Sequence, residues 1–372
     1  MRKLFAIPIL AITLFMLQAQ SAFACGGLLA PDGDVRLARA ATLVSWHDGI
    51  ERYFTSFTYQ VNNGNSVANL GWIVPLPAVP VKVEEGGGWT LQRLFRETHP
   101  ETFSLAPKAA FSSAGTDDSA QVLQQVKVEA LNITVLRGSG AEVLNWAAKN
   151  GFFVDDDVRA HLLIYAKASP IFMAAKYDTA AARARGQLQG DGVPLLITMP
   201  TPHLWVPLEI LALDGQQVQA DLYLLTDGPL YTSDYAAEIG LSSLGANVPG
   251  SVGFNVAFQE KMNPTLYHDL SSDRNMGWVR PDSWLTYLSL DAPASQVTYD
   301  LGISSRGVIH LAPFGTPPMA VVDGQASQLP AWLPGLPLGT PQAALLLTVF
   351  LGAGYALFLI ARGRRLSRQS TR

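Results

Sequence analysis

The sequence contains a single cysteine, Cys25, among its 372 residues. One cysteine cannot form a disulfide within the chain, so the core must be held together by packing alone. A disulfide to another chain through Cys25 stays open. Charged residues are also scarce, at 15%, whereas apolar residues make up 48%. No repeat with a period of roughly 20–50 residues is present, which excludes solenoid and propeller arrays.

Acidic residues are missing from both ends of the chain, because all 30 Asp and Glu lie between residues 25 and 342. The two ends carry seven Lys and Arg, so 19 remain in this region and its net charge is −11, against −4 for the whole chain. Such an acidic region disfavours binding to nucleic acid and to anionic lipid headgroups. We therefore expect no nucleic-acid partner.

Recognisable catalytic and cofactor motifs are absent as well. The sequence has no G-x-S-x-G, no S-x-x-K, no phosphate-binding glycine loop and no dinucleotide fingerprint. No two of its six histidines have the spacing of a metal motif. These histidines are His47, His99, His161, His203, His268 and His310. We expect no metal site and no cofactor.

The N-terminus has the layout of a secretory signal. Arg2 and Lys3 precede the apolar run of residues 4–17, which Pro8 interrupts and which is shorter than a membrane span. Small residues at Ala22 and Ala24 suit cleavage between Ala24 and Cys25. Residues 1–24 are thus interpreted as a signal peptide, and the chain as exported.

Cys25 has two further interpretations at this position. A lipid-attachment box has an aliphatic residue three positions before the cysteine and a small residue two positions before it. Here Ala22 and the bulky Phe23 occupy these positions. Simple cleavage is therefore favoured over lipidation, which stays an alternative.

The C-terminal region is predicted to cross a membrane. Residues 343–361 contain no charge and would form a helix of about 28 Å, close to the thickness of the bilayer core. Arg362, Arg364 and Arg365 follow at once and are interpreted as the membrane stop. The expected topology is single-pass type I, with the bulk of the chain outside the cytoplasm and residues 362–372 as a cytoplasmic tail. Residues 315–342 are rich in Pro and Gly and are interpreted as a stalk.

The region 25–314 alternates between strand and helix patterns. Residues 52–61 alternate as in an antiparallel strand, and residues 69–80, with three prolines, predict an edge strand that runs into an extended segment. Short helices are expected from Thr90, from the capping box of Ser139 and Glu142, and from Asp155. Further strands follow. The fold class is predicted as α+β, with a mostly antiparallel sheet, a few short helices and one C-terminal transmembrane helix; an internal domain boundary is possible near 105–120.

Four segments resemble a family of bacterial proteins, DUF2330. They are the start Cys25-Gly26-Gly27, the pair "GWIVPLP" and "TLQRLFRETHP", the unit that runs from Ile133 to Tyr177, and "VPLEI". The resemblance spans roughly residues 25 to 290. Many members of the family carry further cysteines, whereas this chain has Leu28 and Leu29 at the early positions. The resemblance implies an exported, membrane-attached protein and implies no activity.

Candidate catalytic residues are His203, Asp269 and Asp273, all in polar or ambiguous surroundings. The segment from Asp269 to Asn275, "DLSSDRN", is polar enough for a catalytic or ion-binding loop, although a solvated turn is the favoured interpretation. Trp278 and Trp284 flank proline and polar residues and are the better candidates among the tryptophans for a surface role, although packing in the core is favoured for both.

Three functions follow from these patterns. We favour a membrane-anchored, extracytoplasmic protein of the bacterial envelope that binds a protein or an envelope ligand and is not an enzyme. The first alternative is an envelope hydrolase whose site is assembled from distant residues. The second is a structural subunit of a membrane complex.

Overall fold

The computed structural model divides into two units, residues 1–324 and residues 325–372. It describes residues 22–23, 27–29, 35–61, 71–99, 121–128, 131–152, 154, 156–178, 190–191, 194–212, 217–240, 244–248 and 250–318. All of them belong to the first unit. Of the expected signal peptide, the structure describes only residues 22–23. The segment 105–120, the span 343–361 and the tail 362–372 lie outside the described residues.

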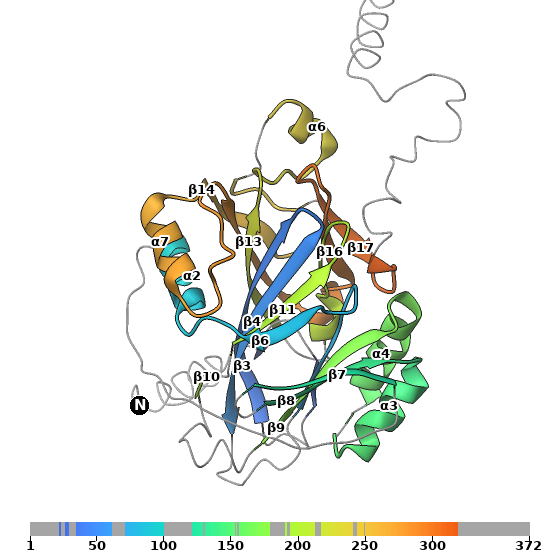
Figure 1. Cartoon of the computed structure of the whole chain (residues 1–372). Helices are drawn as coiled ribbons and strands as arrows, with labels where there is room; N and C mark the ends of the chain where they lie inside the picture. Colours follow the sequence, from blue (N-terminus) through green and yellow to red (C-terminus); the bar gives the residue numbers. More distant parts are fainter. Residues whose placement is uncertain are drawn as a thin grey trace, which may run out of the picture. The chain divides into compact units, whose positions relative to one another are not determined.

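The first unit is built on a nine-stranded sheet that is antiparallel except at two pairs (Figure 1). Its path runs β14 (Phe254–Lys261), β15 (Trp284–Pro293), β13 (Gln217–Thr226), β3 (Val35–His47), β4 (Ile50–Val61), β11 (Leu195–Pro200) and β6 (Lys82–Glu85). Two short strands, β1 (Ala22–Phe23) and β10 (Gly190–Asp191), pair with β13 and β4. At the centre, β13 runs parallel to β3.

Two smaller sheets complete the β structure. The second has the order β2 (Gly27–Leu29), β5 (Gly71–Pro75), β9 (Ile171–Tyr177), β8 (Leu131–Arg137) and β7 (Gln121–Val128). The third has the order β12 (Leu204–Val206), β16 (Tyr299–Ile303) and β17 (Ile309–Pro313). β5 lies between β2 and β9, so the prediction of an edge strand is wrong. Pro75 is the last residue of β5, where a missing N–H interrupts little of the ladder.

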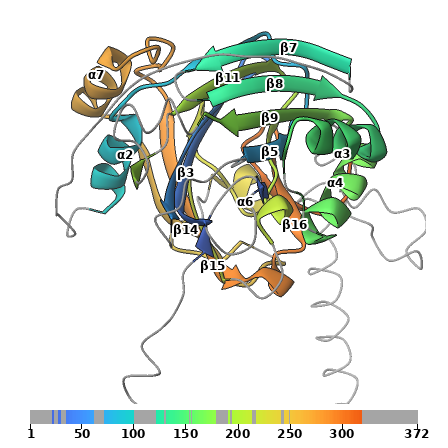
Figure 2. The same ribbon diagram turned by 90° about the horizontal axis from the view of Figure 1, so that it is seen from below.

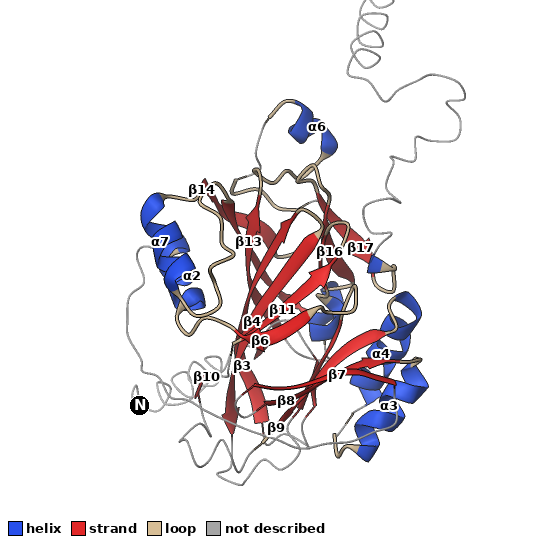
Figure 3. Cartoon of the chain, in the orientation of Figure 1, coloured by secondary structure: helices blue, strands red, loops and turns tan. Residues whose placement is uncertain are grey.

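The helices lie outside the sheets in two pairs on opposite sides of the unit (Figures 2 and 3). One pair is α2 (Thr90–Thr98) with α7 (Pro264–Ser272), and the other is α3 (Gly140–Lys149) with α4 (Asp156–Ala168). The short elements are α6 (Asp234–Glu238), η1 (Glu209–Leu211) and η2 (Ala294–Gln296). The predicted capping box is present, since the backbone N–H of Ser139 donates to Glu142 at 2.7 Å. Gly151, with φ of 72°, follows this helix as expected.

The fold class is therefore α+β with mostly antiparallel sheets, as predicted. The predicted C-terminal transmembrane helix is not supported. Among the described residues, none of the helices combines the length and the apolar character that a bilayer crossing requires. The helices that are observed are amphipathic and cover sheet faces, as the buried Val158 and Leu162 of α4 illustrate.

Both faces of the central sheet are buried, and each faces a separate apolar core. Tyr53 belongs to the larger core, between the sheets and the α3–α4 pair, whereas its neighbour Phe54 belongs to the core under α2 and α7. Val44 and Leu43 divide in the same way. Because successive strand side chains point to opposite faces, residues two apart along β4 share one core. This alternation decides which side chains can meet at the end of the sheet.

Two carboxyl groups are buried where the sheets meet. Glu51 accepts hydrogen bonds from the backbone of Trp205 at 3.1 Å and from Thr201 at 3.3 Å, and burial raises its pKa to about 8. Asp300 accepts hydrogen bonds from Tyr165 at 2.7 Å and from the backbone of Leu208, and burial raises its pKa to about 7. Desolvation outweighs the donated hydrogen bonds at both sites. Both groups hold a proton more tightly in the folded chain than in the unfolded one.

Folding stability should therefore fall as pH rises. A carboxyl whose pKa is raised on folding stabilises the fold fully below its unfolded pKa, and this contribution is lost as pH rises through the folded pKa. For Glu51 the window runs from 4.5 to about 8. One group lowers the free energy of unfolding by up to about 1.4 kcal/mol per pH unit in that window.

We expect Glu51→Gln to remove this contribution and to flatten the dependence, as measured by urea denaturation between about pH 5 and pH 8. Glu238→Gln, at an exposed position in α6, serves as the control and should keep the original slope. Equal slopes in the Glu51→Gln variant and the unchanged protein would contradict the assignment.

Candidate functional site

The turn between β3 and β4 places the first residues of the candidate site. Asp48 and Gly49 join the strands as a two-residue loop, and both have positive φ, of 48° and 75°. Aspartate followed by glycine is the sequence that such hairpin turns prefer. The hairpin brings His47, the last residue of β3, opposite Ile50, and it pairs Ser45 with Arg52. His47, Ser45 and Arg52 thus share one face of the sheet.

The parallel pairing of β13 with β3 brings in a carboxylate from far along the chain. Leu225 pairs with Ser45, so Asp227, two residues later, lies beside His47. The antiparallel partner β15 begins at Trp284 opposite Thr226, which places Ser283 at the same edge. The carboxyl ends of β3 and β13 therefore meet the amino ends of β4 and β15.

A loop between α7 and β15 covers this edge. Trp278 in the loop lies under the guanidinium of Arg52, whose Cζ is 5.3 Å from the ring centroid. This is a cation–π distance. Arg280, from the same loop, forms two hydrogen bonds with the carboxylate of Asp282, from Nε at 3.1 Å and from Nη2 at 2.8 Å. These bonds raise the pKa of Arg280 and lower the pKa of Asp282.

His47 is surrounded by charged partners. Its Nδ1 lies 2.8 and 2.9 Å from the two carboxylate oxygens of Asp227, and its Nε2 lies 3.0 Å from Asp48 and close to Nη1 of Arg280. The two carboxylate oxygens of Asp227 can only accept, so they favour a proton on Nδ1, whereas Nε2 faces both an acceptor, Asp48, and a donor, Arg280. Both ring nitrogens are thereby occupied.

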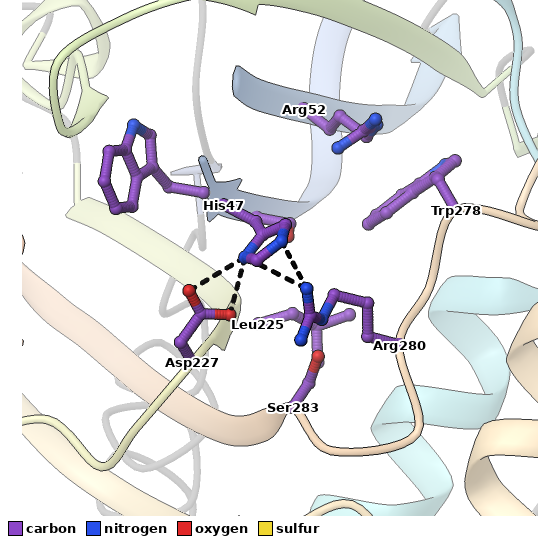
Figure 4. Close-up of a pocket in the computed structure, with 9 residues that line it drawn as sticks. His47, Arg52, Leu225, Asp227, Trp278, Arg280 and Ser283 are labelled. Carbon is purple, nitrogen blue, oxygen red and sulfur yellow. Dashed lines mark hydrogen bonds and ion pairs between the residues drawn. The ribbon is translucent and has the colours of Figure 1, made fainter. Parts of the chain in front are cut away.

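These residues enclose a cavity of about 260 Å³, which we call the arginine pocket (Figure 4). The pocket is lined by Ser45, Trp46, His47, Arg52, Leu225, Asp227, Trp278, Arg280 and Ser283. In Figure 4, Arg52, Trp278, His47 and Arg280 lie around the open space. Two of the four lining groups that can carry charge are therefore permanent cations.

Arg52 is the least compensated charge in the pocket. Its side chain is half-buried, and burial lowers its pKa. Within the described ranges, the Arg52 guanidinium forms no ion pair and no hydrogen bond. It contacts the ring of Trp278. A partly desolvated cation without a counter-ion is unfavourable. The pocket is thus suited to an anionic group, which would pair with Arg52.

Metal binding finds no support here. Among the residues that the structure describes, no group of three or more His, Cys, Asp or Glu side chains could hold a metal ion. At His47, the guanidinium of Arg280 lies against Nε2, the ring nitrogen that does not face Asp227.

The candidate residues from the sequence do not form one site. His203 is buried just before β12, and its Nδ1 lies 3.1 Å from the carbonyl of Leu204. Asp269 and Asp273 lie on and just after α7. In the described part of the chain, no hydrogen bond or ion pair joins His203 to either aspartate. None of the three lines the arginine pocket.

Asp269 and Asp273 instead connect α7 to α2. Asp269 accepts a hydrogen bond from Nε of Arg93 at 2.7 Å. Asp273 accepts from the backbone N–H groups of Gly88 and Trp89, at 3.2 and 3.0 Å, and from the Thr90 hydroxyl at 2.8 Å. Trp89, the residue before α2, offers no side-chain cap. Asp273 binds the two backbone N–H groups just before the helix and the hydroxyl of its first residue, from a position 184 residues away from Trp89 in the chain. The helix begins at Thr90, as expected.

The remaining residues singled out in the sequence are the signal-cleavage pair, the membrane-stop arginines and two tryptophans. Ala24 and Cys25, at the expected signal cleavage, lie outside the described residues, as do Arg362, Arg364 and Arg365. Trp284 begins β15 and is half-buried. Trp278 lines the pocket and is also half-buried against the core under α2 and α7, in agreement with the favoured interpretation as a packed residue.

Sequence reasoning missed His47, Arg52, Asp227 and Arg280. The dipeptide Asp48-Gly49 between two apolar runs is a strong hairpin signal, and it could have placed His47 and Arg52 together. No local signal connects them to Asp227 or Arg280, since the two segments are 180 or more residues apart.

Comparisons with known proteins identify a family. The model of the family DUF2330, described as an uncharacterized protein conserved in bacteria, matches residues 19–269. No curated protein matches the sequence. The match includes His47, Arg52 and Asp227 and ends before Trp278 and Arg280.

Solved structures give only a weak likeness. Baculovirus P35 is 8% identical, with 78% of this chain and 95% of that chain covered and a TM-score of 0.35. A caspase-8/P35 complex also gives 8% identity, with 74% and 91% covered and a TM-score of 0.33. A TM-score this low carries no argument about this chain.

Removing the Asp273 carboxylate should weaken the α2–α7 pair. We expect Asp273→Ala to cost about 2 kcal/mol of stability, because the N–H groups of Gly88 and Trp89 and the Thr90 hydroxyl lose their acceptor. Asp273→Asn keeps one acceptor oxygen and should recover part of the loss. Asp156→Ala, at an exposed first-turn position of α4, is the control and should cost less. Chemical denaturation measures all three, and an unchanged stability in Asp273→Ala would show that Asp273 does not stabilise the contact between α7 and the start of α2.

Proposed function

This chain belongs to DUF2330, a family of uncharacterized proteins conserved in bacteria, and we propose that it is a binding protein that holds a small anionic group in the arginine pocket. The observation that carries this proposal is the uncompensated charge of Arg52. Its guanidinium lines a cavity, is half-buried and has no acidic partner within the described part of the chain. A bound carboxylate, phosphate or sulfate would form charge-assisted hydrogen bonds with it.

Arg280 supports the same ligand chemistry. Its Nε and Nη2 are held by Asp282, so the guanidinium is fixed in orientation, while Nη1 faces His47 at the pocket. A guanidinium held in place loses less conformational entropy when it binds an anion than a free side chain would. Arg52 and Arg280 together thus favour one negatively charged group between them.

Size and overall charge restrict the ligand further. The cavity of about 260 Å³ is slightly below the usual range of small-molecule pockets, which begins at roughly 300 Å³. Residues 25–342 carry a net charge of −11, which repels large polyanions. Both features support a small anion rather than a polymer.

Binding accounts for the geometry better than hydrolysis does. A general base needs a free nitrogen within reach of the proton that it removes. In His47, Asp227 occupies Nδ1, and Asp48 and Arg280 occupy the surroundings of Nε2. The aspartates considered for a hydrolase, Asp269 and Asp273, accept hydrogen bonds from α2 and its start.

The proposed place of action is outside the cytoplasm. The basic Arg2 and Lys3, the apolar run after them, and the small residues Ala22 and Ala24 support export. In that compartment the protein would meet small anions of the bacterial envelope.

Isothermal titration of the full chain with phosphate, sulfate and acetate tests the proposal. We expect at least one of these anions to bind, and Arg52→Gln to weaken that binding by about tenfold or more, since a charge-assisted pair is lost. Arg306→Gln removes the same charge from an exposed residue that pairs with Asp234 outside the pocket, and it should leave the affinity unchanged. Absence of binding to all three anions, or equal affinity in the Arg52 variant, would refute the proposed function.

A further inference from the structure

The charges around the arginine pocket are separated into two ends. Arg52 lies at one end beside Trp278, and Asp227 lies at the other, beyond His47 (Figure 4). Asp48 lies 3.0 Å from the other ring nitrogen of His47 and does not line the cavity, so Asp227 is the acidic residue of the lining. In the described chain, Arg52 forms no ion pair with either carboxylate. The cavity therefore has a positive wall and a negative wall.

The charge balance leaves each wall partly uncompensated. Arg280 forms a bidentate pair with Asp282 and also interacts electrostatically with Asp227, so it has acidic partners where Arg52 has none. Asp227 receives one hydrogen bond from His47, although a carboxylate offers about four acceptor positions. Its side chain is 51% exposed, so it can accept a further donor. One unpaired cation and one acidic group with spare acceptors remain across the cavity.

Resting on the proposed function, we propose that the ligand is a small zwitterion, with a carboxylate that pairs with Arg52 and an ammonium that pairs with Asp227. A simple anion would compensate Arg52 but would lie near Asp227 without a partner for it. A simple cation would be repelled by Arg52 and Arg280. A molecule with both charges satisfies both walls at once.

The apolar lining fits the carbon chain of such a molecule. Trp46, Trp278 and Leu225 line the pocket together with the charged groups. Trp46 is held by a hydrogen bond from its indole N–H to the carbonyl of Thr201 at 2.9 Å, so its position is fixed. A short methylene chain between the two charged ends would remove apolar surface of these residues from water. Amino acids with a short carbon chain have this composition.

A matched ligand series on the full chain tests the inference. The zwitterions are glycine, β-alanine, γ-aminobutyrate and δ-aminovalerate, which differ in the distance between their charges. Each is compared by isothermal titration with the carboxylate of the same carbon chain, from acetate to valerate. We expect at least one zwitterion to bind about tenfold more tightly than its carboxylate counterpart, the gain of one partly buried ion pair.

Two variants test which residue binds each charged end of the zwitterion. Asp227→Asn should abolish the preference for the zwitterion while leaving carboxylate binding in place, which also shows that the variant is folded. Arg52→Gln should weaken both ligand classes. Asp234→Asn, at an exposed acid outside the pocket, serves as the control and should change neither.

The outcomes separate this inference from the proposed function. If carboxylates bind as tightly as every zwitterion, or if Asp227→Asn keeps the preference, the zwitterion is refuted and anion binding stands. If neither ligand class binds the unchanged protein, both the inference and the proposed function are refuted.

Discussion

The parallel pairing of β3 with β13 is the contact on which the rest of the structure depends. It joins two segments about 180 residues apart at the centre of the large sheet, with Leu225 beside Ser45. The register also divides the side chains between the two cores, since Tyr223 and Leu43 face the α2–α7 pair while Leu224 and Val44 face the other sheets. A slip by one residue would exchange these faces. The same register places Asp227 beside His47.

Buried carboxyl groups in this fold connect separate elements of secondary structure. Where sheets and helices meet, a single carboxyl group accepts several donors from another element, as Asp300 does from Tyr165 and the start of η1. Asp273 does the same for the start of α2. Such groups connect elements that apolar packing alone would leave free to slide. Arg52 differs from them, because its charge has no acceptor among the described residues, and this difference marks the arginine pocket.

Local patterns in the sequence were sufficient for single elements. The alternation of residues 52–61, the capping box at Ser139 and the start of a helix near Asp155 each predicted the observed structure. The prediction of β5 as an edge strand was wrong, since proline restricts a strand but does not say which strands flank it. The candidate site could not be predicted either, because residue types do not tell which distant segments come into contact. His203, Asp269 and Asp273 were chosen for their types, and only their contacts reveal that the two aspartates link helices.

The sequence by itself determined the composition and the local elements: a chain with one cysteine, a net charge of −11 over residues 25–342, and an α+β alternation of strands and short helices. These follow from periodicity, capping and turn preferences, which act over a few residues. The tertiary structure alone decided the sheet order and the arginine pocket. Its four charged residues come from β3, β4, the end of β13 and the loop before β15, and only long-range pairing brings such segments together.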